Sequence, residues 1–191
     1  MSDYILAIDQ GTTSSRAALF DQAGQIRSLS QHGFRQEFPR PGFVEHDPEE
    51  LWDSVRHSIS KALADVQAKP RDIVGIGVAN QRETTVAWDR RDGRPLCNAI
   101  VWQDRRTSEY IDELRQTGAG AMIRERTGLV LDAYFSASKL RWILDNVDGA
   151  RLLASEGNLR VGTVDTWVLW KLTAGRCFAT DATNANGTPG L

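Results

Sequence analysis

The hydrophobic pattern begins with two short apolar runs separated by a polar turn. Residues 4–8 are apolar and rich in β-branched side chains, with the length of a buried strand, and residues 17–20 form a second such run. Between them lie an acid, Asp9, then a glycine, four consecutive hydroxyl residues and Arg16. A third run, residues 26–34, alternates loosely. The pattern predicts an antiparallel meander whose first turn carries the polar chemistry.

The pattern then changes to helical spacing. Residues 47–50 combine an N-cap acid, a proline in the first turn and a further acid, and apolar residues recur at helical spacing as far as Val66. We expect this helix to end before Lys69. Residues 73–79 form a near-continuous apolar run, which predicts a strand in the buried middle of an α/β sheet. Its end leads into residues 80–85, and ligands of open α/β sheets gather at the carboxyl ends of strands.

The rest of the chain continues with short strands and several helices. Strands are expected over residues 85–88 and 96–102, and helices over residues 107–116, 119–127 and 136–146. Ser136 is the expected N-cap of the last helix. Residues 161–172 are apolar, and Trp167 and Trp170 should share one helix face. A β-meander followed by αβ units predicts an α/β fold, with a mixed β-sheet and flanking helices.

Composition and charge exclude several classes of function. The chain has 191 residues, enough for one good core or for a large part of a bigger one. Its net charge is −2 and it has no basic block, which argues against nucleic acid as the main partner. No apolar run approaches the length of a membrane span, and Asp3 stands where a signal peptide would be basic. Cys97 and Cys177 lie far apart, so we expect both to be reduced and structural in a cytoplasmic protein. The sequon at Asn186 is then expected to carry no glycan.

The turn after the first strand has the composition of a phosphate site. It can direct backbone N–H groups, hydroxyls and one guanidinium at a single point, which suits phosphate oxygens. Asp9, at the strand end, could anchor hydrated Mg²⁺. The alternative is a Ser/Thr-rich hairpin without a ligand, but the flanking acid and Arg16 favour function. The chain has no G-x-x-x-x-G-K-[ST] motif, and residues 75–80 lack the third glycine of a dinucleotide fingerprint.

A second polar group follows the strand over residues 73–79. Arg82 and Glu83 are adjacent, and a guanidinium donor beside a carboxylate acceptor matches the hydroxyls of a polyol. Such a pair rejects substrates that lack a hydroxyl, because its polar groups would be left unpaired. Taken alone, the pair is better explained as a surface pair beside a turn, Trp102 as a core residue and Tyr134 as a loop anchor.

These motifs together resemble one family. Residues 9–16, Asp-Gln-Gly-Thr-Thr-Ser-Ser-Arg, resemble the phosphate-binding hairpin of the FGGY carbohydrate kinases, within the actin-like ATPase superfamily. Residues 80–84, Asn-Gln-Arg-Glu-Thr, resemble the substrate motif of the glycerol kinases of that family. The loop that ends in Val-Glu-His-Asp-Pro is also similar, with Phe43 where tryptophan is expected. Further similar stretches are residues 101–107, 132–139, 162–167 and 180–185. The resemblance covers about residues 4–185.

The resemblance implies a fold, an activity and a set of site residues. The fold is a ribonuclease-H-like (actin-like ATPase) domain over residues 1–191, and the activity is ATP-dependent phosphorylation of glycerol to sn-glycerol 3-phosphate with Mg²⁺. It implies a small-molecule partner, glycerol, no nucleic acid and no membrane, in a family whose members are often homo-oligomers. The implied contacts are Arg82, Glu83, Trp102 and Tyr134 for glycerol, Thr12, Thr13, Ser14 and Arg16 for phosphate, and Asp9 for Mg²⁺.

The sequence also departs from the family pattern. Family members are much longer, with a second domain and a catalytic base that come after Leu191, so we expect an incomplete domain that is inactive alone. After Ala185 the residues no longer follow the family pattern. One alternative is therefore a truncated, non-catalytic remnant that binds ligands weakly or not at all. Another is an FGGY kinase for a larger sugar, which residues 80–83 fit less well.

Overall fold

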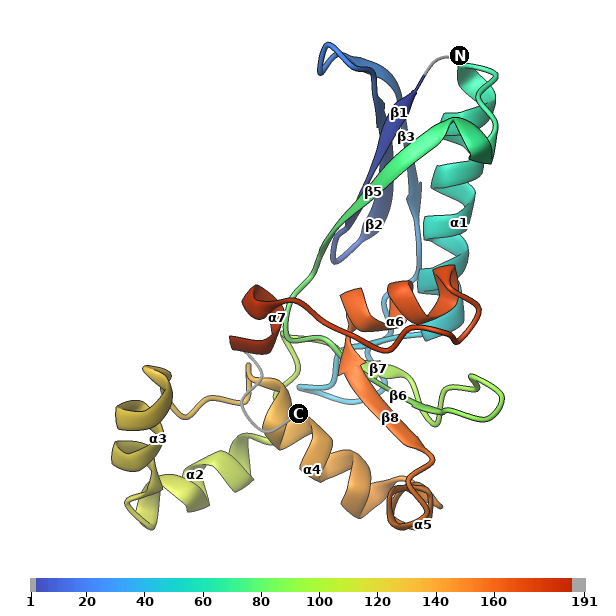
Figure 1. The fold of residues 1–191 in the computed structure, drawn as a ribbon. Coiled ribbons are helices and arrows are strands. Elements are labelled where there is room, and N and C mark those ends of the chain that lie inside the picture. Colours follow the sequence, from blue (N-terminus) through green and yellow to red (C-terminus); the bar gives the residue numbers. More distant parts are fainter. Residues whose placement is uncertain (1–2, 187–191) are drawn as a thin grey trace. The chain divides into compact units, whose positions relative to one another are not determined.

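The computed structural model describes residues 3–186, which form two compact units (Figure 1). Unit 1 comprises residues 3–35 and 49–81, and unit 2 comprises residues 36–48 and 82–186. Each unit has its own sheet and its own helices, and each is described by itself. The sequon that starts at Asn186 extends outside the described residues.

Unit 1 is a mixed four-stranded sheet with a helix on one face (Figure 1). The sheet contains β1 (Tyr4–Gln10), β2 (Ser14–Phe20), β3 (Ile26–Gly33) and β5 (Ile73–Asn80), in the order β3-β2-β1-β5. The first three strands are the predicted antiparallel meander, whereas β5 pairs with β1 in parallel. The helix is α1 (Pro48–Asp65), and the short helix η1 (Pro70–Asp72) precedes β5. Alternation along β1 buries Leu6 and Ile8, and the apolar stripe of α1 buries Leu51 and Val55.

The position of β5 differs from the sequence prediction. An apolar strand was expected in the buried middle of a sheet, but β5 lies at the edge, and among the described residues it pairs only with β1. Val74 is 64% exposed and Ile76 is 52% exposed. Apolar, β-branched composition favours a strand wherever it lies in a sheet, while burial depends on neighbours that are distant in the sequence.

Unit 2 contains a four-stranded antiparallel sheet in the order β4-β7-β6-β8. Its strands are β4 (Glu45–His46), β6 (Thr85–Asp89), β7 (Ala99–Ile100) and β8 (Leu159–Thr163). β7 is much shorter than the strand expected over residues 96–102. All five residues of β6 are buried, because side chains pack on both faces of this strand. Ala87 belongs to a core cluster with Ile143, while Trp88 lies 5.2 Å from Trp167 between ring centroids.

The helices of unit 2 largely follow the predicted pattern. They are α2 (Ser108–Gln116), α3 (Ala119–Thr127), α4 (Ser136–Asn146), α5 (Ala150–Ser155), α6 (Val164–Leu172) and α7 (Ala182–Asn186). The apolar run over residues 161–172 is divided, since β8 ends at Thr163 and α6 begins at Val164. Trp167 and Trp170 do share a face of α6, and both rings pack against Trp88.

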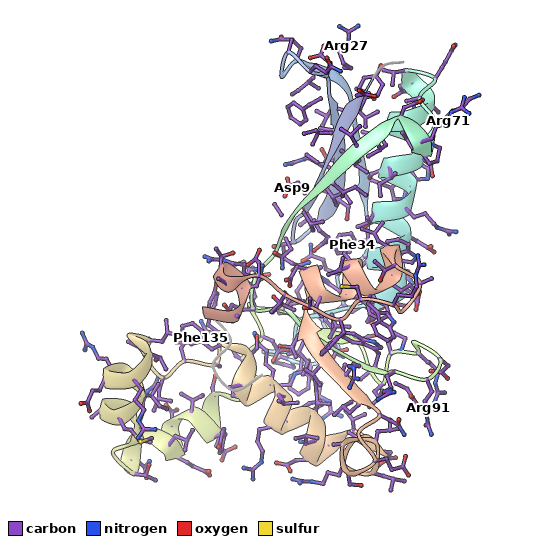
Figure 2. All side chains as sticks on the ribbon, in the orientation of Figure 1. Asp9, Arg27, Phe34, Arg71, Arg91 and Phe135 are labelled. Atoms are coloured by element: carbon purple, nitrogen blue, oxygen red, sulfur yellow. The ribbon has the colours of Figure 1, made fainter. Side chains whose placement is uncertain are left out.

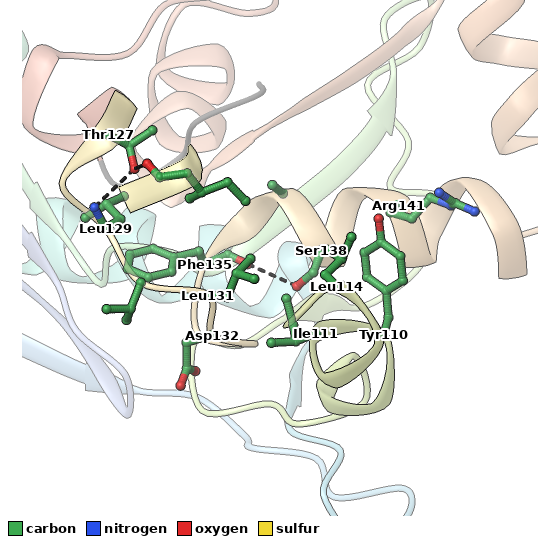
Figure 3. A pocket seen from close by; sticks show the side chains of 13 residues that line it. Tyr110, Ile111, Leu114, Thr127, Leu129, Leu131, Asp132, Phe135, Ser138 and Arg141 are labelled. Carbon is green, nitrogen blue, oxygen red and sulfur yellow. Dashed lines mark hydrogen bonds between the residues drawn. The ribbon is translucent and has the colours of Figure 1, made fainter. Parts of the chain in front are cut away.

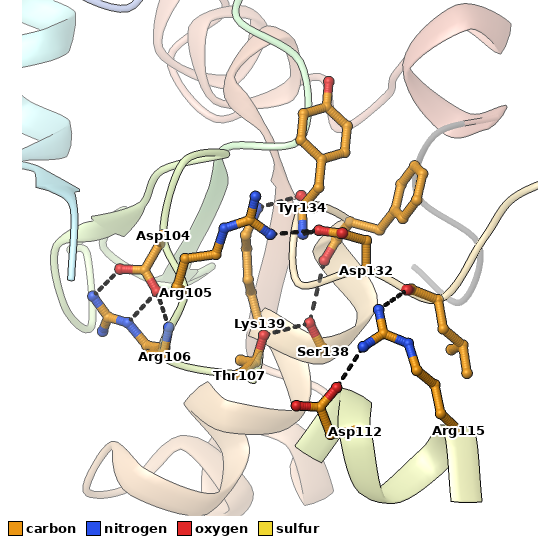
Figure 4. Close-up of polar contacts among 12 residues, drawn as sticks. Asp104, Arg105, Arg106, Thr107, Asp112, Arg115, Asp132, Tyr134, Ser138 and Lys139 are labelled. Carbon is orange, nitrogen blue, oxygen red and sulfur yellow. Dashed lines mark hydrogen bonds and ion pairs between the residues drawn. The ribbon is translucent and has the colours of Figure 1, made fainter. Parts of the chain in front are cut away.

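A buried arginine fixes the loop over residues 36–48 within unit 2. The Arg106 guanidinium donates hydrogen bonds to Asp104 and, at 2.7 Å, to the Glu45 carboxylate (Figure 4 shows the Asp104 contacts). It lies 4.0 Å from the ring centroid of Phe43 and 4.5 Å from that of Trp142. Phe43, which stands where the family pattern has tryptophan, therefore anchors this loop through its contact with Arg106.

The described residues also bear on two expectations from composition. Cys97 and Cys177 are both free, and burial raises the pKa of the Cys97 thiol to about 11, which suits an unreactive structural residue. Within residues 3–186, no helix combines the length and the apolar character needed to cross a membrane.

Candidate functional site

The hairpin between β1 and β2 is tighter than the sequence suggested. The Gly11 amide donates to the Ser14 carbonyl at 3.0 Å, and β2 already begins at Ser14. Only Thr12 and Thr13 lie in the turn itself. Ser14 and Ser15 are strand residues because their backbones pair with β1 or β3.

Successive side chains of β2 point to opposite faces of the sheet, so the hydroxyls of Ser14 and Ser15 have different partners. Ser15 is fully buried, its Oγ lies 2.7 Å from Oγ of Ser54 in α1, and its carbonyl accepts a hydrogen bond from Ser58. Ser15 therefore docks the strand on the helix. Ser14 accepts a 2.8 Å hydrogen bond from the side-chain amide of Gln31. Arg16 donates to Oε1 of Gln31 at 3.2 Å.

Asp9 and Arg16 form the charged part of this hairpin. They are opposite each other in the β1–β2 register, and their side chains form a 3.1 Å ion pair in which both are about half exposed. Asp9 lies on the side of the sheet away from α1 (Figure 2). A single half-exposed carboxylate is a suitable ligand for Mg²⁺, because this ion usually keeps several waters and is bound by one or two carboxylates together with the phosphates of the substrate.

Two glutamines support the turn, and sequence reasoning missed this role. Gln10 is fully buried and Gln81, directly after β5, is 6% exposed. The Gln81 side-chain amide donates to Oε1 of Gln10 at 3.1 Å and to the Gly11 carbonyl at 3.2 Å. The Gln10 amide donates to the same carbonyl at 2.7 Å. The sequence does hint at this role, because Gln10 and Gln81 each lie in one of the two polar motifs that follow a predicted strand, residues 9–16 and 80–84.

In unit 2, three of the four predicted polyol residues come together around the start of α4. The Trp102 amide donates to Oγ1 of Thr84 at 3.2 Å, which ties the tryptophan to the residue after Glu83. The rings of Trp102 and Tyr134 lie 6.0 Å apart with an interplanar angle of 67°. Arg82 is exposed and adjoins Glu83 in the chain.

Glu83 is the most constrained of these residues. It is 3% exposed and has a φ of 67°, in the left-handed region that non-glycine residues rarely adopt. Burial raises the pKa of its carboxyl group, and the nearby Lys139 and Ser136 partly offset this rise. The carboxylate accepts a 3.3 Å hydrogen bond from Ser136. Ser136 was expected to be an N-cap, but Phe135 takes that position, and the serine hydroxyl is used by Glu83 instead.

The Tyr134 loop is held by two nearby residues, Asp132 and Lys139, and by Arg105, which is distant in the sequence. The Tyr134 amide donates to Asp132 at 2.8 Å, and Arg105 pairs with the same carboxylate at 2.7 Å (Figure 4). Lys139 is fully buried, and its ammonium donates to the Tyr134 carbonyl at 2.6 Å. Sequence reasoning assigned no role to Lys139, because a lysine in the first turns of a helix is usually exposed.

Unit 2 also contains a separate pocket with a mainly apolar lining. It has a volume of about 230 Å³ and is lined by α2, α3, α4 and the segment before α4 (Figure 3). Its walls include Ile111, Leu114, Leu131 and Phe135. An apolar lining does not match phosphate or a small polyol, so we assign it neither ligand.

The comparisons with protein families and with curated proteins relate the chain to the same family. The chain matches the FGGY family of carbohydrate kinases, N-terminal domain, over residues 4–190. It is 56% identical over 185 residues to a glycerol kinase from Chromobacterium violaceum, covering 97% of this chain and 37% of that protein. It is 53% identical over 188 residues to a glycerol kinase from Bacillus thuringiensis, covering 98% of this chain and 38% of the relative. The chain thus spans less than two-fifths of the length of these curated relatives.

Solved structures show the same relationship. The fold resembles that of Plasmodium falciparum glycerol kinase with ADP, with a TM-score of 0.90, 33% identity, and coverage of 98% of this chain and 37% of that chain. It also resembles a xyloylose kinase from Brucella ovis, with a TM-score of 0.81, 28% identity, and coverage of 96% and 36%. These neighbours have the actin-like ATPase fold expected from the motifs. The chain therefore belongs to the FGGY family of carbohydrate kinases, of which it carries the N-terminal domain sequence.

Proposed function

We propose that this chain supplies the phosphate hairpin and the polyol half-site of an ATP-dependent glycerol kinase. The observation that carries the proposal is the convergence of Glu83, Trp102 and Tyr134 in unit 2. The Glu83 and Tyr134 carbonyls share the Lys139 ammonium, and the Trp102 and Tyr134 rings lie 6.0 Å apart. The glycerol kinases to which the chain is more than half identical support the choice of substrate.

Each polyol residue would contribute a different interaction. The Glu83 carboxylate accepts hydrogen bonds from substrate hydroxyls, and the exposed Arg82 guanidinium donates to them. The Trp102 ring packs on the carbon backbone, and the Tyr134 hydroxyl hydrogen-bonds a further substrate hydroxyl. This combination requires a small molecule with several adjacent hydroxyls.

The hairpin in unit 1 would bind the phosphate groups of ATP. Thr12, Thr13 and Ser14 would donate hydroxyl or backbone hydrogen bonds, and Arg16 would add a charge-assisted contact. Asp9 would hold hydrated Mg²⁺, which neutralises phosphate charge when it is bound. Phosphoryl transfer depends mainly on positioning and electrostatics, which are what these two groups of residues provide.

Direct ligand titration tests the polyol half of this proposal. Glycerol added to the isotope-labelled chain should produce saturable NMR shifts at Glu83, Trp102 and Tyr134. Propane-1,2-diol, which lacks one hydroxyl, should bind at least about tenfold more weakly, because site groups would be left unpaired. Xylulose and gluconate test whether a larger sugar is preferred.

A matched pair of variants completes the titration. Glu83→Gln removes the charge and keeps the shape, so its glycerol affinity should fall about tenfold or more, in line with the loss of a hydrogen bond to a charged group. Glu125→Gln makes the same change at an exposed position of α3 and should bind like the unsubstituted chain. The proposal would be wrong if glycerol caused no saturable shifts, or if the diol bound equally well.

A further inference from the structure

Lys139 contacts the backbones of two predicted substrate residues at once. Its side chain is fully buried, and its ammonium donates to the Glu83 carbonyl at 2.8 Å and to the Tyr134 carbonyl at 2.6 Å. Figure 4 shows the lysine reaching from α4 toward Tyr134. Glu83 and Tyr134 lie on different loops, so one cation joins two segments that are distant in the sequence.

The Glu83 end of this contact is strengthened by a second donor. The Ser136 hydroxyl donates to the same Glu83 carbonyl at 3.1 Å. Both donors come from the first turns of α4, and the residue that they hold is the one with a φ of 67°. A non-glycine residue keeps this conformation only when its surroundings enforce it. The two bonds therefore fix the backbone geometry that sets the direction of the Glu83 side chain.

Packing alone does not account for a lysine at this position. Burial lowers the pKa of Lys139 to about 7, with Glu83 and Asp104 favouring the charged form and Arg105 and Arg106 opposing it. A buried ammonium is unfavourable unless it is hydrogen-bonded, whereas a methionine of similar length would fill the same space without that penalty. What the lysine provides, and a methionine would not, is the pair of donors to the two carbonyls.

We propose that Lys139 is a positioning residue for the polyol site, which fixes the separation between Glu83 and Tyr134 through their backbone carbonyls. Ser136 assists it at Glu83. The inference rests on the proposed function, because it assigns Lys139 a role in glycerol binding. Both Lys139 bonds go to main-chain oxygens, so the lysine occupies neither the Glu83 carboxylate, which Ser136 contacts at 3.3 Å, nor the Tyr134 hydroxyl.

The test compares glycerol binding by four variants of the full chain, using NMR titration and thermal unfolding. Lys139→Met should weaken glycerol binding at least tenfold and shift the amide signals of Glu83 and Tyr134. Lys139→Arg keeps a cationic donor and should recover part of the lost affinity. Ser136→Ala keeps both lysine bonds but removes the serine contacts with the Glu83 carbonyl and carboxylate, so it should weaken binding about threefold and tests the assisting role of Ser136. If Lys139→Met does not fold, Lys139→Arg still tests the lysine, because it should bind glycerol more weakly than the unsubstituted chain.

Ile143→Val is the control for a general loss of stability. Ile143 is fully buried in the same helix, and the substitution should lower the unfolding temperature without changing glycerol affinity. Unchanged affinity in Lys139→Met and Ser136→Ala would overturn the inference and leave the proposed function intact. So would an equal loss of affinity in Ile143→Val. If the unsubstituted chain binds no glycerol, the proposed function fails and the inference fails with it.

Discussion

Asp9 and Arg16 face each other across the β1–β2 hairpin, and their side chains form a 3.1 Å ion pair. Arg16 also donates to Gln31 on the next strand, so its guanidinium is held at the surface in one orientation. An exposed pair of this kind adds little to stability, about 0–1 kcal/mol. The pair therefore contributes little to folding, and its part in ligand binding stays a prediction.

Replacement of Arg16 tests the phosphate role of this hairpin. Arg16→Ala should weaken binding of Mg²⁺-ATP by about 1.5–3 kcal/mol, because a charge-assisted contact is lost. Calorimetric titration of the chain measures the change. Arg27→Ala, which removes an exposed guanidinium paired with Asp21 on the same sheet, should leave the affinity unchanged. Equal affinities in the two variants would contradict the assignment.

Arg106 should be important for stability and not for ligand contact. Its side chain is 2% exposed, and Asp104, which it pairs with, is 1% exposed. Arg106→Ala would leave a buried carboxylate without its cation, which costs about 3–5 kcal/mol. Urea denaturation measures this loss. Arg56→Ala, which breaks an exposed pair with Asp53, should change stability by no more than about 1 kcal/mol.

His46 should make the fold sensitive to acid. Burial lowers the pKa of His46 from 6.5 to about 4, so between these values the unfolded chain binds a proton that the folded chain does not. Stability should therefore fall as the pH drops from 6.5 to 4, by about 1.4 kcal/mol per pH unit at most. Urea denaturation across this range gives the slope. His46→Gln should flatten it, and an unchanged slope would exclude His46 as the cause.

The edge strand β5 should promote self-association of the chain. Its Val74 and Ile76 are more than half exposed, and exposed apolar edge strands pair readily with other chains. Sedimentation velocity should show concentration-dependent association, which Val74→Lys should reduce. Leu152→Lys makes the same change at a residue of α5 that is 62% exposed but not on a sheet edge, and it should have little effect. A monodisperse, unsubstituted chain would refute this prediction.

Glycerol phosphorylation by this chain alone should be undetectable. Among the described residues, the acids at the two predicted half-sites already have other proposed roles: Asp9 pairs with Arg16 and would hold Mg²⁺, and Glu83 would accept hydrogen bonds from the substrate. A positioned general base contributes about 10²–10⁴-fold to such a reaction. An ADP-release assay with glycerol checks this expectation. Glycerol-dependent turnover that disappears in Glu83→Ala would show that the chain is sufficient for catalysis.

Local patterns were enough to predict much of the secondary structure. The bounds of α3 and α4 agree with their predicted ranges, because periodicity and flanking residues are properties of the segment itself. The antiparallel meander was also predicted correctly, since short polar turns join its strands. The family resemblance then supplied the fold that sequence periodicity alone left open.

Contacts between distant segments could not be predicted in the same way. The edge position of β5 depends on which strands pair with it, and the role of Lys139 depends on the carbonyl of Glu83, which is 56 residues away in the chain. The four consecutive hydroxyl residues, 12–15, show the same limit of prediction from local sequence. Nothing in four consecutive hydroxyl residues indicates that Ser15 is buried against Ser54 while Arg16 is exposed.

The burial of Ser15 beside the exposed Arg16 has a consequence for changes in the length of the turn. An insertion or deletion between Gly11 and Ser14 that shifts the pairing of β2 by one residue would move every following residue of β2 to the opposite face of the sheet. Arg16 would then point at Ser54 and Ser58 of α1, and Ser15 would face solvent. Substitutions within the turn keep this register. Evolution can therefore vary the side chains of this turn more freely than its number of residues.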